Sequence, residues 1–272
     1  MKIAYFGYDL MLDCFRALIA AGEDVSWVFL SKCDNEYDFN AALRREALAR
    51  RIPVYEGKPT IDQISALQRR ECELIVSAGY SWKIPIPSEL LGINVHPTLL
   101  PEGRGPWPLP WIILFGAQSS GVTVHLMSNE FDRGDIIGQR IFTIRQKPTI
   151  AYLEQKLQKI APRLLLDVVR NLPAALKSRR AQASGSYWPM PTEADRTLDW
   201  TKTVAELSTI IRAFGRYGCC ALVQDEPWLI TEAYTRSARH SLATGSVIHR
   251  NKTILVAVTD GFVVIKKWQH DY

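Results

Sequence analysis

The stretch Cys72–Tyr80, CELIVSAGY, is the strongest buried-strand pattern in the first half of the chain. It is apolar over most of its length and follows a predicted helix at 60–71, as expected for a strand covered on both faces of a sheet. Upstream, KIAYFGY at 2–8 and DVSWVFL at 24–30 are also predicted strands. Strands that alternate with helical patterns predict an α/β fold, a Rossmann-like and mostly parallel sheet with crossover helices.

The segments between these strands carry helix signals. Residues 9–21 are expected to form a helix that ends at Gly22, and residues 40–51 an amphipathic helix with Asn40 as its candidate N-cap. The first strand-to-helix turn, FGYDLML at 6–12, lacks GxGxxG, and the chain contains neither GxxxxGKS nor GxxxxGKT. The phosphate-cradling loops of dinucleotide-dependent dehydrogenases and P-loop enzymes are therefore missing.

Composition places the chain among ordinary globular proteins. With 272 residues, 47% hydrophobic and 22% charged, it is long enough for a sizeable core in one or two domains. No apolar run approaches the ~20 residues of a membrane span, and the first residues lack a signal-peptide pattern. Five cysteines without repeated spacing predict reduced thiols in a cytoplasmic protein, and no metal site is expected. The net charge of +5 fits an anionic substrate, although solvated helix faces are the commoner cause of such basic clusters.

The stretch Asn94–Trp111, NVHPTLLPEGRGPWPLPW, is the first with residues suited to catalysis. If LGIN ends a strand, Asn94 and His96 share one face at the carboxyl edge of the sheet, where open α/β sheets bind ligands. An amide beside an imidazole is suited to stabilising the oxyanion of an attacked carbonyl. The prolines that follow fix φ, and the glycines let the backbone approach a ligand closely, so that with Arg104 they predict a rigid loop. On spacing alone, a surface loop with a satisfied histidine is the commoner interpretation.

A second polar turn follows another predicted strand. GVTVHLM at 121–127 alternates apolar and polar residues, and SNEFDRGDII at 128–137 then places Asp132 in a glycine-containing turn. A carboxylate that returns to the same edge can orient the imidazole of His96, hold it charged or relay a proton. Taken singly, Asp132 is also a common turn-forming residue, and His125 is interpreted as a structural strand histidine.

Together these motifs resemble one known family. INVHPTLLPEGRGPWP, followed by GVTVHLMSNEFDRGDII, closely resembles the 10-formyltetrahydrofolate-dependent formyltransferases, which include glycinamide ribonucleotide, methionyl-tRNA and amino-sugar formyltransferases. The resemblance extends to ELIVSAGYSWKIP at 73–85 and LDWTKTVAELSTIIRAF at 198–214, and so covers most of the chain. Two separated motifs in the right order outweigh the alternative interpretation of each one alone.

The resemblance implies an N-formyltransferase that uses 10-formyltetrahydrofolate as its formyl donor and co-substrate. On the matching positions, Asn94, His96 and Asp132 are the expected catalytic set. The family's mechanism implies that Asn94 and His96 bind the oxyanion of a tetrahedral intermediate. Asp132 is then expected to keep His96 suitably protonated and to help move the amine proton to the leaving N10, directly or through water.

The resemblance also implies binding residues. Arg104 and Gly105 fall where the family meets its amine substrate, which is often anionic. The folate pocket is expected to include the segments around Tyr80 and Asn129, and the positions are Tyr80, Trp82, Ile84, Asn129, Glu130, Phe131 and Asp135. Tyr80 and Trp82 are equally suited to being core or rim aromatics.

The rest of the chain predicts a second domain. A strand at 136–144 and a long helix at 150–172 complete the first unit, after which the composition becomes polar and rich in Gly, Ser and Pro. The expected division is a catalytic domain at 1–180, a linker at 181–197 and a small domain at 198–272. The small domain is expected to open on a helix that Thr203 caps, with Glu206 at the capping-box position. Short β-like runs follow, which predicts an OB-like β-barrel.

The choice of amine lies outside the shared motifs. Transfer-RNA-acting members carry a long basic insertion after the second strand, whereas this chain has LSKCDNEYDFNAALRREALARR at 30–51, which begins acidic. GRYGCCAL at 215–222 also replaces a proline-rich stretch that is often found in the methionyl-tRNA and amino-sugar members with a similar C-terminal domain, which disfavours nucleic-acid contact by this domain. Nucleic acid is therefore disfavoured as a partner. A membrane partner is disfavoured by the lack of a long apolar run, and a homodimer is left open. The preferred acceptor is a nucleotide-linked amino sugar. A hydroxyornithine or peptide-precursor amine, methionyl-tRNA, weak hydrolysis of formyl-folate, and a folate-sensing binding protein are the alternatives.

Overall fold

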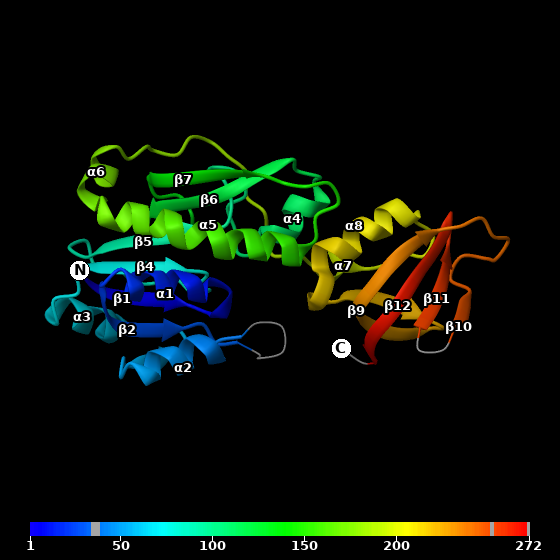
Figure 1. The fold of residues 1–272 in the computed structure, drawn as a ribbon, viewed down its shortest axis with the longest axis horizontal. Coiled ribbons are helices and arrows are strands. Elements are labelled where there is room, and N and C mark those ends of the chain that lie inside the picture. The colour runs from blue at the N-terminus through cyan, green and yellow to red at the C-terminus, as the bar shows by residue number, and fades with distance from the viewer. Residues whose placement is uncertain (34–38, 251–252, 271–272) are drawn as a thin grey trace. The chain divides into compact units, whose positions relative to one another are not determined.

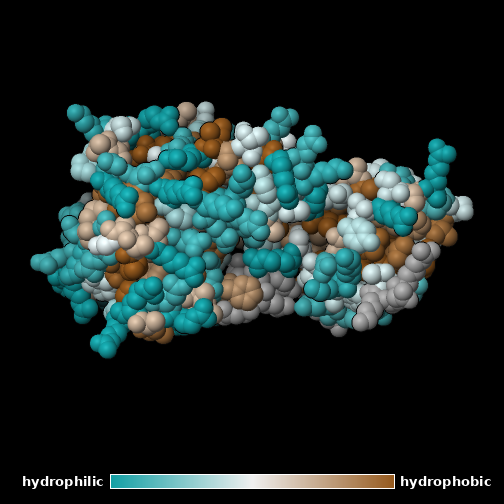
Figure 2. All heavy atoms as spheres, in the orientation of Figure 1, coloured by the Kyte–Doolittle hydropathy of each residue, from teal (hydrophilic) through white to brown (hydrophobic). Residues whose placement is uncertain are grey.

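The computed structural model describes residues 1–33, 39–250 and 253–270, and the chain divides into two compact units (Figure 1). The first unit consists of Met1–Pro108, Ser119–Thr143 and Glu154–Pro189, and the second of Leu109–Gln118, Ile144–Leu153 and Met190–Tyr272. The acidic stretch 34–38, used above against a tRNA acceptor, lies outside the described residues. On the face shown in Figure 2, hydrophilic residues cover much of the surface and hydrophobic ones form separate patches.

The first unit is built on a seven-stranded sheet in the order β3-β2-β1-β4-β5-β6-β7. Strands β1 to β5 pair in parallel, and β6 and β7 are added antiparallel at one side. The predicted Rossmann-like, mostly parallel sheet is thereby confirmed. The strands are β1 (Lys2–Gly7), β2 (Asp24–Leu30), β3 (Val54–Glu56), β4 (Leu74–Ala78), β5 (Leu91–His96), β6 (Ser119–Leu126) and β7 (Ile136–Thr143).

Helices connect and cover these strands. α5 packs on β7, where the backbone of Gly138 faces the side chains of Leu164 and Val168. None of the helices in the described ranges combines the length and the apolar character needed to cross a bilayer. The helices are η1 (Asp9–Met11), α1 (Leu12–Ala20), α2 (Ala41–Ala49), α3 (Ile61–Arg69), α5 (Ile150–Arg170) and α6 (Leu172–Lys177).

The predicted cap of the second helix differs from the observed one. Asn40 occupies the N-cap position of α2, but its side chain makes no capping bond and instead donates to the carbonyl of Ser31, 2.8 Å away. The carboxylate of Asp9 accepts the first free N–H groups of α2, from Ala42 at 3.0 Å and Leu43 at 2.8 Å. A side chain from a distant turn therefore stabilises the start of this helix.

The second unit contains a separate five-stranded antiparallel sheet in the order β10-β11-β12-β9-β8, as the series of short β-like runs predicted. Thr203 caps α8 through the expected capping box with Glu206. α4 contacts α8, so the short segment that carries α4 groups with this unit. The elements are α4 (Leu109–Leu114), α7 (Glu193–Arg196), α8 (Val204–Phe214), η2 (Gly215–Tyr217), β8 (Cys219–Val223), β9 (Glu226–Ser237), β10 (Val247–Arg250), β11 (Thr253–Val258) and β12 (Gly261–His270).

The last crossing of the chain from the first unit to the second lies between Pro189 and Met190. This position falls inside the segment 181–197 that the sequence predicts as a linker. All five cysteines are free thiols, and four of them are buried. Burial raises the pKa of the Cys219 thiol to about 12, so this group stays protonated and unreactive near neutral pH.

Candidate active site

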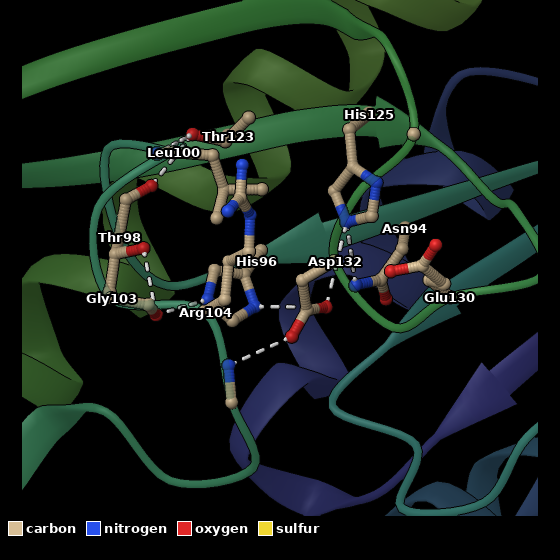
Figure 3. Close-up of polar contacts among 12 residues, drawn as sticks. Asn94, His96, Thr98, Leu100, Gly103, Arg104, Thr123, His125, Glu130 and Asp132 are labelled. Atoms are coloured by element: carbon tan, nitrogen blue, oxygen red, sulfur yellow. Dashed lines mark hydrogen bonds and ion pairs between the residues drawn. The ribbon is translucent and has the colours of Figure 1, made fainter. Parts of the chain in front are cut away.

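The candidate site is centred on β5 and β6. Asn94 and His96 both belong to β5, two residues apart, so their side chains emerge on the same face of the sheet. β6 runs antiparallel beside them, with His125 directly opposite Asn94 and Thr123 opposite His96. Figure 3 shows Asn94, His96, His125 and Asp132 turned toward one another. Strand β5 ends at His96, two residues beyond the predicted strand end at LGIN.

Asp132 reaches this face from the turn after β6. Its Oδ1 lies 3.5 Å from Nδ1 of His96 and 3.8 Å from Nε2 of His125, and its Oδ2 accepts the backbone N–H of Gly105 at 3.0 Å. The carboxylate is therefore held between two imidazoles and a backbone donor. The sequence prediction that Asp132 returns to Asn94 and His96 corresponds to this arrangement.

The turn that carries Asp132 is tightly constrained. Asp132 has a φ of 57°, in the left-handed region. A Cβ on Gly134 would lie 1.7 Å from the carbonyl oxygen of Leu126, so only glycine fits there. The side-chain amide of Gln182 donates to the carbonyls of both Asp132 and Gly134, each at 2.8 Å. These contacts fix the direction of the carboxylate before any ligand binds.

His96 has both ring nitrogens engaged. Its side chain is only 5% exposed, and Nε2 donates to the carbonyl of Gly103 at 2.8 Å. A carbonyl oxygen only accepts hydrogen bonds, so Nε2 carries a hydrogen. The other ring nitrogen, Nδ1, faces Asp132. A proton on Nδ1 is stabilised by the carboxylate, so the pair is arranged to hold or release a proton at this atom.

The loop between His96 and Gly105 is rigid for identifiable reasons. The hydroxyl of Thr98 donates to the carbonyl of Glu102 at 2.7 Å, and the hydroxyl of Thr123 donates to the carbonyl of Thr98 at the same distance. Gly105, with a φ of 125°, could not carry a Cβ, which would lie 2.0 Å from the carbonyl oxygen of Trp188. This glycine is therefore required by the 182–188 segment, whereas the sequence interpretation had assigned the glycines to close approach of a ligand.

Arg104 and Gly105, the predicted substrate-binding residues, already have partners within the protein. Arg104 is 3% exposed, and its guanidinium donates to the side chain of Gln182 and to the carbonyl of Ala183. The backbone N–H of Gly105 is used by Asp132. Arg104 thus ties the loop at 97–105 to the segment after α6, and it also contributes to the wall of a pocket.

That pocket has a volume of about 350 Å³ and a positively charged lining. Its three cations outnumber its one carboxylate, Glu130, which pairs with Arg133 at 2.8 Å. Phe131 and Tyr187 are large aromatic side chains that are more than half exposed. The lining residues are Lys83, Arg104, Asn129, Glu130, Phe131, Arg133, Gly185 and Tyr187. An anionic ligand with a flat apolar part fits this lining.

The predicted folate-binding residues fall into two groups. Asn129, Glu130 and Phe131 line the pocket, next in sequence to Asp132. The hydroxyl of Tyr80 donates to the carbonyl of Gly57, and its ring packs edge-on against a buried core phenylalanine with ring centroids 5.2 Å apart.

The remaining three predicted positions also have neighbours within the protein. Ile84 belongs to the same hydrophobic cluster as Tyr80, and Trp82 packs edge-on against Tyr80. Asp135 pairs with Arg179 at 3.2 Å. Any folate contact from the Tyr80 segment therefore falls to its backbone or to Trp82, whose side chain is half-buried.

Sequence reasoning missed two residues of the site. His125 is 2% exposed and lies 3.1 Å from the side-chain amide nitrogen of Asn94. Burial lowers the pKa of His125 to about 4, and the neighbouring His96 contributes to the lowering. Gln182, in the predicted linker, anchors both Asp132 and Arg104. The alternation of apolar and polar residues on β6 shows on which face of the strand His125 lies. Only the register between β5 and β6 shows that Asn94 is its neighbour.

Two protein-family models match successive parts of this chain. Residues 50–169 match the family model described as formyl transferase, and residues 191–271 match that of the formyl transferase C-terminal domain. The chain is 27% identical over 232 residues to a methionyl-tRNA formyltransferase from Listeria monocytogenes serotype 4a (strain HCC23), covering 82% of this chain and 74% of that one.

Two solved structures share the fold. HypX from Aquifex aeolicus, in complex with tetrahydrofolic acid, aligns with 100% of this chain at a TM-score of 0.77 and 20% identity, and this chain spans only 44% of HypX. An N-formyltransferase from Helicobacter canadensis, in complex with folinic acid and dTDP-3-aminofucose, aligns with 99% of this chain and 100% of its own length at a TM-score of 0.69 and 18% identity. Since two models of one family match successive segments that make up most of the sequence, this chain belongs to the formyltransferase family.

Proposed function

We propose that this protein is an N-formyltransferase that moves the formyl group of 10-formyltetrahydrofolate to the primary amine of a small substrate. The observation that carries the proposal is the convergence of the Asn94 amide, the His96 imidazole and the Asp132 carboxylate on one face of the sheet. They supply a neutral hydrogen-bond donor, a proton-transfer group and a carboxylate that steers it. Formyl transfer to an amine needs these three functions.

In the proposed reaction, the lone pair of a neutral amine attacks the formyl carbon, and the carbonyl π electrons move onto the oxygen. An N–H group of Asn94 stabilises the resulting oxyanion. The amine nitrogen loses a proton to the His96–Asp132 pair, and N10 of the folate takes up a proton as its bond to the formyl carbon breaks. The products are a formamide and tetrahydrofolate, and no other co-reactant is consumed.

The geometry around His96 supports Nδ1 as the atom that handles the proton. Nε2 is occupied by the carbonyl of Gly103, so Nδ1, 3.5 Å from Asp132, is in position to accept and return it. For His96 also to donate to the oxyanion, one of these two contacts must be exchanged when substrates bind. Asn94 is therefore assigned the main share of oxyanion binding, and His96 the main share of proton transfer.

The pocket beside Asp132 supports a folate donor. Tetrahydrofolates carry an aromatic ring and a carboxylate tail, and the lining offers exposed Phe131 together with Lys83 and Arg133. The structures of HypX and of the Helicobacter canadensis enzyme hold tetrahydrofolic acid and folinic acid respectively. Asn129, Glu130 and Phe131 are proposed to bind the folate because this pocket combines positive charge, aromatic surface and proximity to Asp132.

For the acceptor, the preferred substrate is a nucleotide-linked amino sugar. The Helicobacter canadensis structure, which matches this chain along nearly its full length, holds dTDP-3-aminofucose. The net charge of +5 also favours an anionic acceptor over a neutral one. A cytoplasmic location belongs to the same proposal, because both proposed substrates are metabolites of that compartment.

Methionyl-tRNA is the second candidate acceptor. It is favoured by the Listeria monocytogenes relative, with which this chain shares 27% identity over 232 residues. It is opposed by the sequence after β2, which lacks a long basic insertion. A hydroxyornithine-type amine and a folate-binding sensor without turnover are the further alternatives that the experiment must separate.

The test is a transfer assay with 10-formyltetrahydrofolate, following tetrahydrofolate release with panels of nucleotide-linked amino sugars, hydroxylated ornithine and charged methionyl-tRNA. We expect release that depends on one amino sugar in the wild-type protein and is abolished in His96→Ala. Release with charged tRNA alone would replace the sugar by the second candidate. Folate binding without release with any amine would replace the enzyme by a sensor.

A further inference from the structure

The least expected contact of the site joins His125 to Asn94. The two residues stand directly opposite each other in the antiparallel pairing of β5 and β6. Nε2 of His125 lies 3.1 Å from the amide nitrogen of Asn94, which is hydrogen-bonding distance (Figure 3). His125 touches neither the pocket lining nor the loop at 97–105 through any hydrogen bond in the described part of the chain. Its polar contacts are therefore directed at Asn94, at its own strand and, over the longer distance of 3.8 Å, at Oδ1 of Asp132.

The second ring nitrogen determines the tautomer of His125. Nδ1 lies 2.8 Å from the carbonyl oxygen of Leu126, and a carbonyl oxygen only accepts hydrogen bonds, so Nδ1 carries the hydrogen. A neutral imidazole has one N–H, which leaves Nε2 as an acceptor. Burial, assisted by the charge of His96, lowers the pKa of His125 to about 4, against the opposing effects of Leu126 and Asp132. Near neutral pH the ring is therefore neutral, with an acceptor facing Asn94.

An acceptor at this place removes the rotational ambiguity of the Asn94 amide. The amide has a donor end, Nδ2, and an acceptor end, Oδ1, which exchange places on a 180° rotation. With Nδ2 toward His125 the two groups form a hydrogen bond, whereas the rotated amide would set two acceptors against each other. In the observed orientation one N–H of Nδ2 is used by His125. The other finds no acceptor among the described residues and is free for a ligand.

We propose that His125 is a positioning residue that locks the Asn94 amide so that an N–H group, and not the carbonyl oxygen, faces the oxyanion of the tetrahedral intermediate. The inference rests on the proposed formyl transfer and deepens it, because it explains how a freely rotating side chain becomes a preorganised donor. Donors that are aligned before the reaction stabilise developing charge without reorganising at that moment. The chain of contacts runs from the Leu126 carbonyl through His125 to Asn94.

The first test reads the tautomer directly and needs no turnover. Nitrogen-15 NMR of the wild-type protein at neutral pH is expected to show His125 with a protonated Nδ1 and an unprotonated Nε2, assigned by the loss of these signals in His125→Gln. A protonated Nε2, or a doubly protonated ring, would overturn the proposal, because neither state accepts from Asn94. Apart from the assignment through His125→Gln, this measurement requires only the wild-type protein.

The second test compares two replacements of His125. His125→Leu removes the acceptor at similar size, and His125→Gln keeps an acceptor in its side-chain carbonyl. We expect His125→Leu to lower kcat roughly tenfold with little change in the KM for the folate donor, and His125→Gln to recover part of the loss. Val124→Ala, the adjacent strand residue with its side chain on the opposite face, serves as the control for general damage to β6 and should keep wild-type kcat.

A double-mutant cycle separates positioning from mere packing. In an Asn94→Ala background, His125→Leu should cause no further loss of kcat, because the amide that it positions is already absent. Equal losses in both backgrounds would show that His125 acts independently of Asn94 and would overturn the inference. Failure of the proposed function looks different: the wild-type protein would then release no tetrahydrofolate with any amine.

Discussion

Nδ1 of His96 lies 3.5 Å from Oδ1 of Asp132, although His96 ends strand β5 and Asp132 belongs to the turn that follows α4 and β6 later in the chain. The carboxylate is also held by the backbone N–H of Gly105, so its position does not depend on the imidazole alone. The pair is therefore present before substrates bind. In the proposed reaction it needs only to exchange a proton with the amine.

Replacing Asp132 by Asn is expected to lower kcat by about 10²–10⁴-fold, because the amide cannot stabilise a proton on Nδ1 of His96. Steady-state kinetics against pH should show a flattened profile, with the KM for the folate donor nearly unchanged. Asp167→Asn, which removes an exposed carboxylate paired with Arg140, is the matched control and should behave as wild type. An unchanged pH profile in Asp132→Asn would contradict the assigned role.

Replacing Gly134 by Ala is expected to damage both stability and activity. The added Cβ would lie 1.7 Å from the backbone carbonyl oxygen of Leu126, so the turn that carries Asp132 must shift. Thermal or urea unfolding should show a loss of at least about 2 kcal/mol. Gly22→Ala, at a positive φ of 82° but with open space around it, should cost about 1 kcal/mol and leave kcat intact. Equal effects of the two changes would show that the turn at Gly134 is not constrained as described.

Replacing Lys83 by Ala is expected to weaken binding of an anionic ligand in the pocket about two- to fivefold, since an exposed charge contributes at most about 1 kcal/mol. Titration calorimetry with tetrahydrofolate should show the loss at low ionic strength and a smaller one at 0.5 M salt, because salt screens exposed charges. Lys159→Ala, which removes an exposed lysine of α5 outside the pocket, provides the comparison. The same weakening in both variants would indicate a non-specific effect of net charge.

The burial of His125 predicts a pH dependence of stability. Its pKa falls from 6.5 to about 4 on folding, mainly through desolvation. Between these values the unfolded chain binds more protons than the folded one, so the free energy of unfolding decreases as the pH is lowered from 6.5 to 4. The full effect is on the order of 3 kcal/mol, and it is present above pH 6.5 and lost near pH 4.

Urea unfolding of the wild-type protein and of His125→Leu over this pH range measures that contribution. The free-energy difference between the two should shrink as the pH falls, since only the wild-type protein has this group to protonate. The charged and titratable groups near the His125 ring, His96, Asp132 and Arg104, are present in both proteins. Parallel curves would mean that His125 is not buried in its neutral form.

Local patterns were sufficient for much of the architecture. The alternation of apolar strands and amphipathic helices predicted the parallel sheet, and the spacing of Thr203 and Glu206 predicted the capping box that starts α8. These features depend on residues a few positions apart, where the 2.0 and 3.6 periodicities and the capping geometry act. The family motifs, likewise contiguous, were enough to nominate Asn94, His96 and Asp132.

The distant contacts could not be obtained in this way. Asp9 caps α2 in place of the expected Asn40, Gln182 holds the turn of Asp132, and His125 meets Asn94 across two strands. From sequence alone, then, come the elements, the fold class and the chemical groups of the site. The packed structure supplies their partners and the orientation of the Asn94 amide. The physical reason is that periodicity shows which face a residue occupies, whereas strand register and the path of the chain establish what lies opposite it.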